Sequence, residues 1–162
     1  MTERVWTNEQ VVELLRRIGD MLDILGEDRY RVLAYRRAAD NIETLGQDVA
    51  ELWRAGQLRD IPGVGEALAR KLDELLRTGR LDYYERLQAQ VPPGVVDMLA
   101  IPDVGPKRVR LLWQEAGLTS ISEVKAAAQA GELRKLPGLG AKSEANILAG
   151  IQALLETRAL EP

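Results

Sequence analysis

Cysteine and histidine are both absent from the 162 residues of this sequence. The lack of cysteine excludes disulfides, zinc–cysteine sites, iron–sulfur clusters and thiol catalysis. The lack of histidine excludes Ser-His and Cys-His nucleophilic pairs and removes imidazole as a general base. Any catalysis that this chain performs must therefore rest on other side chains.

Long apolar runs are absent as well. No stretch approaches the ~20 apolar residues that a helix needs to cross a bilayer. The first four residues, Met1 to Arg4, are not a charged segment followed by an apolar stretch, so we expect no secretory signal peptide. We therefore expect a soluble, cytoplasmic monomer with no membrane partner.

An excess of basic charge is also missing, because the net charge is -3 whereas most DNA-binding domains are basic. The acidic charge is concentrated in residues 1–28, which hold seven acidic and three basic side chains. The rest of the chain carries a net charge of +1, with its bases in local clusters. Because local clusters set contact while global charge sets long-range steering, nucleic-acid binding of modest, salt-sensitive affinity is expected.

The hydrophobic pattern predicts an all-α protein of helical bundle subdomains, since apolar residues recur at helical spacing and no stretch alternates like a half-buried strand. Thr7 and Gln10 have the spacing of a capping box, and Gly26 is a suitable stop for the helix after them. Further helices are predicted at 29–45, 48–54, 66–77, 82–89, 94–100, 106–116, 122–130 (capped by Ser122) and 141–157. The Pro92–Pro93 pair separates two predicted domains, 1–90 and 91–162.

Three segments repeat one pattern directly before an amphipathic helix: an apolar residue, proline, glycine or aspartate, an apolar residue and glycine. They are Ile61-Pro-Gly-Val-Gly65, Ile101-Pro-Asp-Val-Gly105 and Leu136-Pro-Gly-Leu-Gly140. Glycine permits positive φ and the close approach of another backbone. The first amides of the following helix lack internal partners and, with the helix dipole, favour an anion. We therefore predict three helix-hairpin-helix motifs that bind DNA phosphates without reading base sequence.

Each repeat is followed by a basic residue within five positions, which favours phosphate binding over tight turns that need glycine for steric reasons alone. The predicted DNA contacts are Gly63, Gly65, Arg70, Gly105, Lys107, Arg108, Gly138, Gly140 and Lys142. The second repeat departs from the pattern, because Asp103 replaces glycine and Pro106 removes one amide donor. The Asp103 carboxylate could repel a phosphate, point away from it, or help to hold a cation. We expect the second hairpin to be the weaker clamp.

Five segments resemble the N-terminal part of family X DNA polymerases, particularly the bacterial and archaeal ones. They are 31–39, 61–73, 78–81, 101–107 and 136–142. The resemblance implies a fold like the N-terminal region of DNA polymerase beta. Residues 1–90 would form a lyase-like domain with the first hairpin, and residues 91–162 a fingers-like domain with the other two. It also implies that the first hairpin holds the 5′-phosphate side of a DNA gap and the second holds the primer side.

The resemblance further implies specific site residues. Arg31 and Tyr35 match positions that hold the sugar and 5′-phosphate, and Lys71 matches the lysine with which several members remove 5′-deoxyribose phosphate. The carbonyl groups that match monovalent-cation ligands, for Na⁺ or K⁺, are those of Arg59, Ile61, Val64, Leu99, Ile101 and Val104. No other cofactor is expected.

A Schiff-base lysine must be neutral to attack the C1′ aldehyde. The apolar stripe Leu68, Leu72 and Leu75 and the charge of Arg70 would both favour a neutral Lys71 amine. Ala67 stands where some lyase-active relatives have a second lysine, which argues against efficient lyase chemistry. The alternative is that Lys71 contacts phosphate or is simply solvated.

Three functions follow as hypotheses. The first is sequence-independent DNA binding in DNA repair and gap filling, including base excision repair, at gapped, nicked or recessed ends. The second is a 5′-deoxyribose-phosphate or abasic-site lyase that uses Lys71, and the third is a protein-interaction scaffold, which the acidic balance suits. The chain has no Asp-x-Asp pair for a two-Mg²⁺ polymerase site and no histidine for a metal nuclease. By itself it is expected to be neither polymerase nor nuclease, and to be a polymerase fragment or a free-standing relative.

The tryptophans and the basic residues of the first predicted helix have structural interpretations. Trp6, Trp53 and Trp113 are interpreted as packing residues, and Arg16 and Arg17 as a solvated face.

Overall fold

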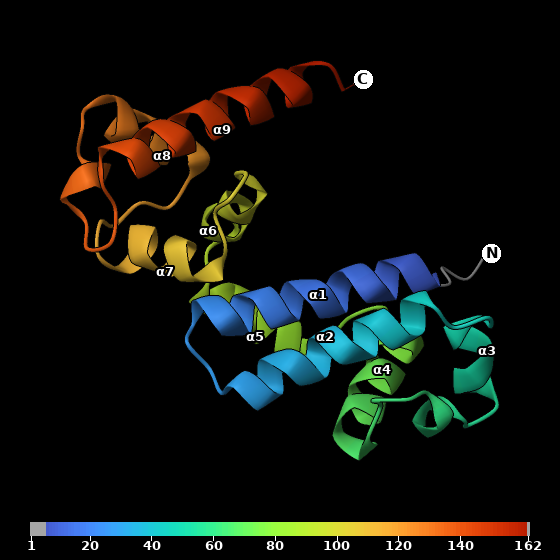
Figure 1. Cartoon of the computed structure of the whole chain (residues 1–162). Coiled ribbons are helices and arrows are strands. Elements are labelled where there is room, and N and C mark those ends of the chain that lie inside the picture. Colours follow the sequence, from blue (N-terminus) through green and yellow to red (C-terminus); the bar gives the residue numbers. More distant parts are fainter. Residues whose placement is uncertain (1–5, 162) are drawn as a thin grey trace. The chain divides into compact units, whose positions relative to one another are not determined.

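In the computed structural model, residues 6–161 are described and all of their regular structure is helical, without strands. The all-α prediction is therefore confirmed over this part of the chain. The chain forms two units, Met1–Gln90 and Val91–Pro162. Figure 1 shows the helices of both units.

The first unit contains five α-helices and one 3₁₀ turn within the described residues. They are α1 Asn8–Ile24, α2 Arg29–Glu43, α3 Val49–Arg54, the 3₁₀ turn η1 Leu58–Asp60, α4 Glu66–Thr78 and α5 Asp82–Gln90. Helices α1 and α2 pack side by side, as Figure 1 shows. The apolar stripe of α1, including the fully buried Val11 and Ile18, and the fully buried Val32 and Ile42 of α2 contribute to the core of this unit.

The sequence signals at the ends of α1 are confirmed. The Thr7 hydroxyl accepts a hydrogen bond from the Gln10 amide at 3.1 Å, and the Thr7 amide donates to the Gln10 side chain at 3.0 Å. These two bonds satisfy amides that have no partner within the helix. Gly26 follows the helix with a φ of 77°, a conformation that glycine adopts without a Cβ penalty.

Ion pairs join α1 to α2, and they correct the interpretation of Arg16 as a solvated residue. Its guanidinium lies 3.0 Å from Asp40 and 2.9 Å from Glu43. Hydrogen bonds from Arg16 hold the pKa of the Glu43 carboxyl below its usual value. The sequence offered no signal for this, because Arg16 lies 24 and 27 residues from its partners.

The second unit also consists of short helices that lead into one long helix. They are α6 Pro93–Asp97, the 3₁₀ turn η2 Met98–Ala100, α7 Pro106–Gln114, α8 Ile121–Gln129, the 3₁₀ turn η3 Leu133–Lys135 and α9 Ala141–Ala159. Its core includes the fully buried Val95, Met98, Leu112 and Val124. The C-terminal part of α9 is tied to α6, because Arg158 donates to Asp97 at 2.8 and 3.2 Å.

Two predictions for this unit were wrong in detail. The expected helix 94–100 is divided into the α-helix α6 and the 3₁₀ turn η2. The cap of α8 is Ser120, whose hydroxyl accepts from the Glu123 amide at 3.1 Å, and not Ser122. The Thr119 amide in turn donates to the Glu123 carboxylate at 3.1 Å, so this helix start is doubly satisfied.

Candidate nucleic-acid interface

The three repeats share one backbone conformation, with a 3₁₀ turn, a β-turn and then a helix. In each β-turn the amide of the second apolar residue donates to the carbonyl of the first. The N···O distances are 3.0 Å for Val64–Ile61, 3.1 Å for Val104–Ile101 and 3.1 Å for Leu139–Leu136. Most apolar residues of these turns point inward, since Ile61, Val64, Ile101 and Val104 are at most 5% exposed; in the third turn Leu139 is buried and Leu136 half-buried. The hairpins are therefore fixed to their units by packing, and their polar backbone faces outward.

The residue after the proline has positive φ in every repeat: 84° at Gly63, 63° at Asp103 and 80° at Gly138. Proline followed by a residue of positive φ is the signature of a type II turn. Asp103 is the only residue other than glycine with positive φ in the described chain. Aspartate tolerates this conformation better than most residues, so the second hairpin keeps the geometry of the others. The departure at Asp103 therefore changes charge and leaves the turn intact.

The last glycine of each repeat does not use positive φ, so of the two properties of glycine only the close approach of another group applies to it. Gly65, Gly105 and Gly140 have φ values of -89°, -92° and -117°, which any residue adopts. A Cβ at any of the three positions would meet no atom within 4 Å. Each is the N-cap of its helix, and no side chain caps these three helix starts. The first amides of α4 and α9, and that of Lys107 in α7, therefore have no capping side chain, and open space lies beside each N-cap glycine.

The predicted basic contacts lie beside these helix starts. Lys107 and Lys142 are exposed and Arg108 is half-buried, and none of them pairs with an acidic side chain of the described residues. Arg70 differs, because its guanidinium lies 2.5 Å from Glu66 in the first turn of α4. The pair is 77% and 64% exposed, so solvent screens it strongly. Arg70 can exchange Glu66 for a phosphate at little cost.

The first hairpin is also held from α2, by a residue that the sequence analysis missed. The Asn41 side-chain amide donates to the Pro62 carbonyl at 2.7 Å. It approaches so closely that a Cβ at Gly63 would lie 3.1 Å from the Asn41 nitrogen. Asn41 therefore fixes the β-turn that precedes α4.

Lys71, Tyr83 and Tyr35 form one cluster behind this hairpin. The Lys71 ammonium lies 4.9 Å from the ring centroid of Tyr83, and the Tyr83 ring stacks on Tyr35 with centroids 6.1 Å apart. Burial raises the pKa of the Tyr35 hydroxyl. Tyr35 is only 7% exposed, so any direct contact with a sugar is confined to a small part of its surface. Arg31 is exposed on the same helix, 3.7 Å from Glu27.

The third hairpin contains an ion pair with one buried partner, which the sequence analysis also missed. Glu144, in the first turns of α9, is 3% exposed and accepts from the Arg134 backbone amide at 3.0 Å and from its Nε at 2.9 Å. Burial acts to raise the pKa of Glu144, but the hydrogen bonds from Arg134 outweigh it and lower that pKa. The matching positions in the other repeats are Ala69 and Val109. Glu144 thus occupies a position that is apolar in the other two repeats, and this difference is the sequence signal that could have indicated a buried partner.

The predicted cation ligands lie along the hairpin backbones. Ile61 and Ile101 each use one carbonyl lone pair to accept the turn amide, and a second lone pair remains. Acidic side chains offer no alternative, since no group of three or more lies within metal-binding reach in the described part. The monovalent cation stays a prediction of the family resemblance.

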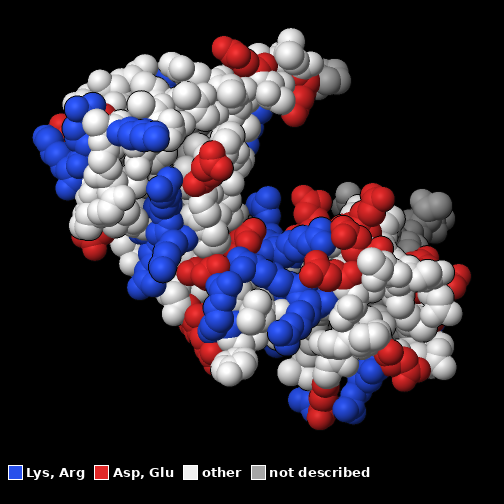
Figure 2. All heavy atoms as spheres, in the orientation of Figure 1, with Lys and Arg blue, Asp and Glu red and all other residues white. Residues whose placement is uncertain are grey.

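Charge is distributed differently over the two units in the view of Figure 2. Over α1 and α2, blue Lys and Arg side chains alternate with red Asp and Glu, in keeping with the ion pairs between these helices. In the second unit the blue side chains of this face stand mostly among uncharged residues. No helix of the described residues is long and apolar enough to cross a membrane.

Comparisons with known proteins agree with this geometry. Residues 6–81 match the family model "Helix-hairpin-helix domain", and residues 95–153 match "SAM-like Helix-hairpin-helix tandem". The chain is 29% identical over 143 residues to DNA polymerase/3'-5' exonuclease PolX of Bacillus subtilis (strain 168), covering 88% of this chain and 25% of that protein.

Two DNA polymerases lambda are similar over 119 residues, or 73% of this chain. The rat protein, from Rattus norvegicus, is 26% identical with 20% of its length covered, and the Arabidopsis thaliana protein is 25% identical with 22% covered. The chain thus spans a quarter or less of the length of these relatives. Two helix-hairpin-helix family models thus match the chain, which has homology to the N-terminal portion of family X DNA polymerases.

Proposed function

We propose that this chain binds DNA through backbone phosphates at its three hairpins, without reading base sequence. The helix-hairpin-helix matches and the homology to DNA polymerases support DNA as the partner. One observation carries the proposal, the open space beside Gly65, Gly105 and Gly140 at uncapped helix starts. Neither backbone conformation nor packing within the described chain calls for glycine there. An approaching phosphate does call for glycine at these positions, because it must come within hydrogen-bond distance of the amides.

We further propose that this binding serves DNA repair at gaps, nicks or recessed ends. The protein would act there as a cytoplasmic monomer. Support comes from the relatives, which are named as DNA polymerases. A Na⁺ or K⁺ held by the hairpin carbonyls would add positive charge next to the phosphate. The first and third hairpins should contribute most, because the second has a carboxylate at Asp103 and no amide donor at Pro106.

The test is a titration of gapped DNA with a 5′-phosphate against intact duplex, at two salt concentrations, with Gly65→Val and a matched Gly46→Val. A Cβ at Gly46 also meets nothing within 4 Å, but Gly46 lies outside the hairpins. Gly65→Val should weaken binding at least tenfold, because charge-assisted hydrogen bonds contribute about 1.5–3 kcal/mol each. Gly46→Val should bind like the natural chain, and thermal melting should show both variants folded.

Salt dependence gives a second readout of the same experiment. Each phosphate contact contributes about -0.9 to the slope of log K against log salt, so Gly65→Val should flatten the slope. Equal binding by Gly65→Val and Gly46→Val would refute phosphate binding at the first hairpin. No binding at low salt by the folded chain would leave the protein-interaction scaffold.

For Lys71 we propose the role of a charged phosphate contact. Its ammonium lies over the face of Tyr83, and a ring face attracts the ammonium and not the neutral amine. Schiff-base chemistry needs the neutral amine, so this contact opposes the lyase alternative. Borohydride reduction with DNA that bears a 5′-deoxyribose phosphate should therefore trap no adduct. A trapped adduct that Lys71→Ala abolishes would establish the lyase instead.

A further inference from the structure

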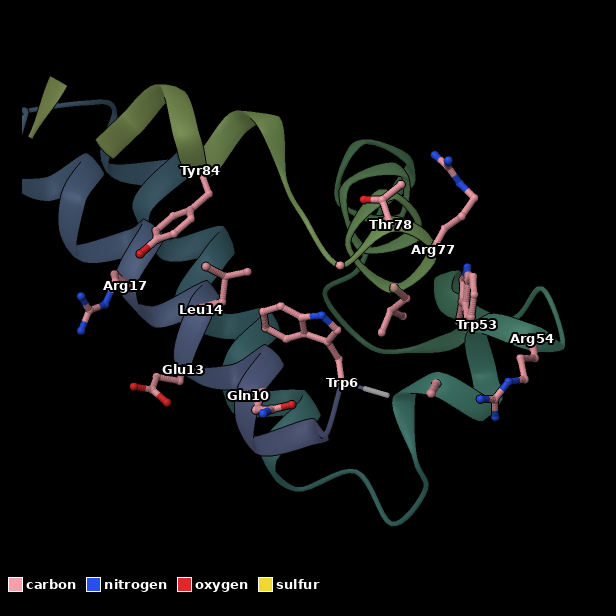
Figure 3. Close-up of a pocket in the computed structure, with 13 residues that line it drawn as sticks. Trp6, Gln10, Glu13, Leu14, Arg17, Trp53, Arg54, Arg77, Thr78 and Tyr84 are labelled. Atoms are coloured by element: carbon pink, nitrogen blue, oxygen red, sulfur yellow. The ribbon is translucent and has the colours of Figure 1, made fainter. Parts of the chain in front are cut away.

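The first unit has a groove at the end of α4 that lies opposite the hairpin. Its volume is about 830 Å³, and Figure 3 shows the residues that line it. Its walls come from the start of α1, from α3, from the C-terminal turn of α4 and from α5. None of the residues assigned to DNA binding, lyase chemistry or cation binding lines it. The groove therefore requires its own explanation.

Three aromatic rings form much of this groove. Trp6, Trp53 and Tyr84 are each half-buried, so part of every ring remains accessible. In Figure 3 the Trp6 indole extends across the middle, with Tyr84 and Trp53 on either side. The Trp53 ring is held in place, because its indole nitrogen donates to Asp73 at 2.8 Å. All three rings therefore present accessible surface to the same cavity.

Arginines stand at both ends of the groove. Figure 3 shows Arg17 at one end and Arg54 at the other, and Arg77 lies above Trp53. Arg17 and Arg54 are exposed and pair with no acidic side chain of the described residues. Arg77 lies 3.5 Å from Asp73, in a pair that is 60% and 50% exposed. Glu13 is the one carboxylate among the described residues of the lining, so three arginines face one acidic side chain there.

The aromatic rings and the arginines together indicate which class of ligand the groove can bind. A purely apolar ligand would desolvate guanidinium groups without pairing them, which is costly. A small inorganic anion would leave the rings unoccupied. A nucleotide satisfies both, because its base stacks on aromatic faces and its phosphate pairs with arginine. The volume lies within the range of about 300–1,000 Å³ that is usual for pockets that bind small molecules.

We propose that the groove lined by Trp6, Trp53 and Arg17 binds an unpaired nucleotide, with the base on the rings and phosphates on the arginines. The same chemistry could belong to a free nucleotide or to a single-stranded end of bound DNA. The second source rests on the proposed phosphate binding at the hairpin. Helix α4 has 13 residues and spans about 20 Å, and a strand that rises about 3.4 Å per nucleotide covers this with roughly six nucleotides.

The experiment compares a 5′-phosphorylated duplex with the same duplex extended by a 12-nucleotide single strand, and it takes the ratio of the two dissociation constants. We expect the extension to tighten binding by about tenfold. Arg17→Gln, at an exposed site, and Trp6→Leu should bring the ratio close to one. Arg29→Gln is the matched control, since Arg29 is exposed but lies outside the groove, and it should leave the ratio unchanged.

Failure of the hairpin proposal appears separately in these data. Gly65→Val should weaken binding of both DNAs and preserve their ratio, because the groove is unaltered. A deoxynucleoside monophosphate that quenches tryptophan fluorescence saturably, with quenching lost in Arg17→Gln, would support the site and assign it to a free nucleotide. An extension that adds nothing, together with no quenching, would overturn the proposal. So would a ratio that Arg17→Gln and Trp6→Leu both leave at the natural value.

Discussion

The charge of Asp103 gives a sharp test of how the second hairpin meets DNA. Asp103→Asn removes the carboxylate and retains a residue that also adopts positive φ readily, so the turn should persist. Asp103 lies two residues before Gly105, and two residues span at most about 7 Å. We take about 7 Å, the length of this span, as the order-of-magnitude separation between the carboxylate and a phosphate on the first amides of α7.

The repulsion at that distance follows from Coulomb's law. Two unit charges about 7 Å apart repel by about 0.6 kcal/mol in bulk water and by about 2.4 kcal/mol at an effective dielectric of about 20. Because Asp103 is exposed, the smaller value applies, which corresponds to about threefold in affinity. The screening length is about 8 Å at physiological salt, so the gain should shrink as salt is raised.

The assay is fluorescence anisotropy with labelled gapped DNA at low and physiological salt. Glu156→Gln is the matched control, because it makes the same charge change at an exposed position of α9, about 23 Å along the helix from its start. We expect Asp103→Asn to tighten binding about threefold at low salt and Glu156→Gln to have a smaller effect. Weaker binding by Asp103→Asn would mean that the carboxylate helps to hold a cation. Identical binding by both variants would refute a phosphate at the second hairpin.

Two further predictions concern the stability of the second unit. The lowered pKa of Glu144 stabilises the fold above its ordinary value of 4.5, and this contribution is lost as pH falls through the folded-state pKa. Thermal melting should therefore show that Glu144→Gln is less stable at pH 7 and loses less stability as pH falls below 4.5; parallel curves would contradict this. Gly94→Ala should destabilise by about 3 kcal/mol, the upper end for overpacking, because its Cβ would lie 2.1 Å from the Thr119 carbonyl oxygen. Gly46→Ala, in open space, should change stability by less than about 0.5 kcal/mol. A loss as small as this in Gly94→Ala would show that the loop accommodates the clash.

The hairpins could be predicted from the sequence because their determinants are local. Proline and glycine at adjacent positions specify a β-turn, and the helix that follows has clear apolar periodicity. The cap of α8 was equally local and was still missed. Ser120 and Glu123 have capping-box spacing, and the structure confirms them where Ser122 was chosen.

The remaining features depend on residues that are distant in sequence. The hydrogen bond from Trp53 to Asp73 joins positions 20 residues apart, and the Tyr35–Tyr83 stack joins two helices that no motif connects. The groove beside Trp6 exists only when four helices assemble around it. Such contacts are products of packing, so composition and periodicity could indicate that these residues are partly buried but not what they contact.

The two glycine positions of the repeat differ in what the fold requires of the residue that occupies them. The first position requires positive φ, and Asp103 demonstrates that a residue other than glycine meets this requirement. The last position requires nothing of the kind, since its φ is ordinary and its surroundings are empty. Yet glycine stands there in all three repeats. If folding alone determined the pattern, substitution would be expected at the last glycine before the first. The observed order is the reverse, and it follows directly if the empty space belongs to a DNA phosphate.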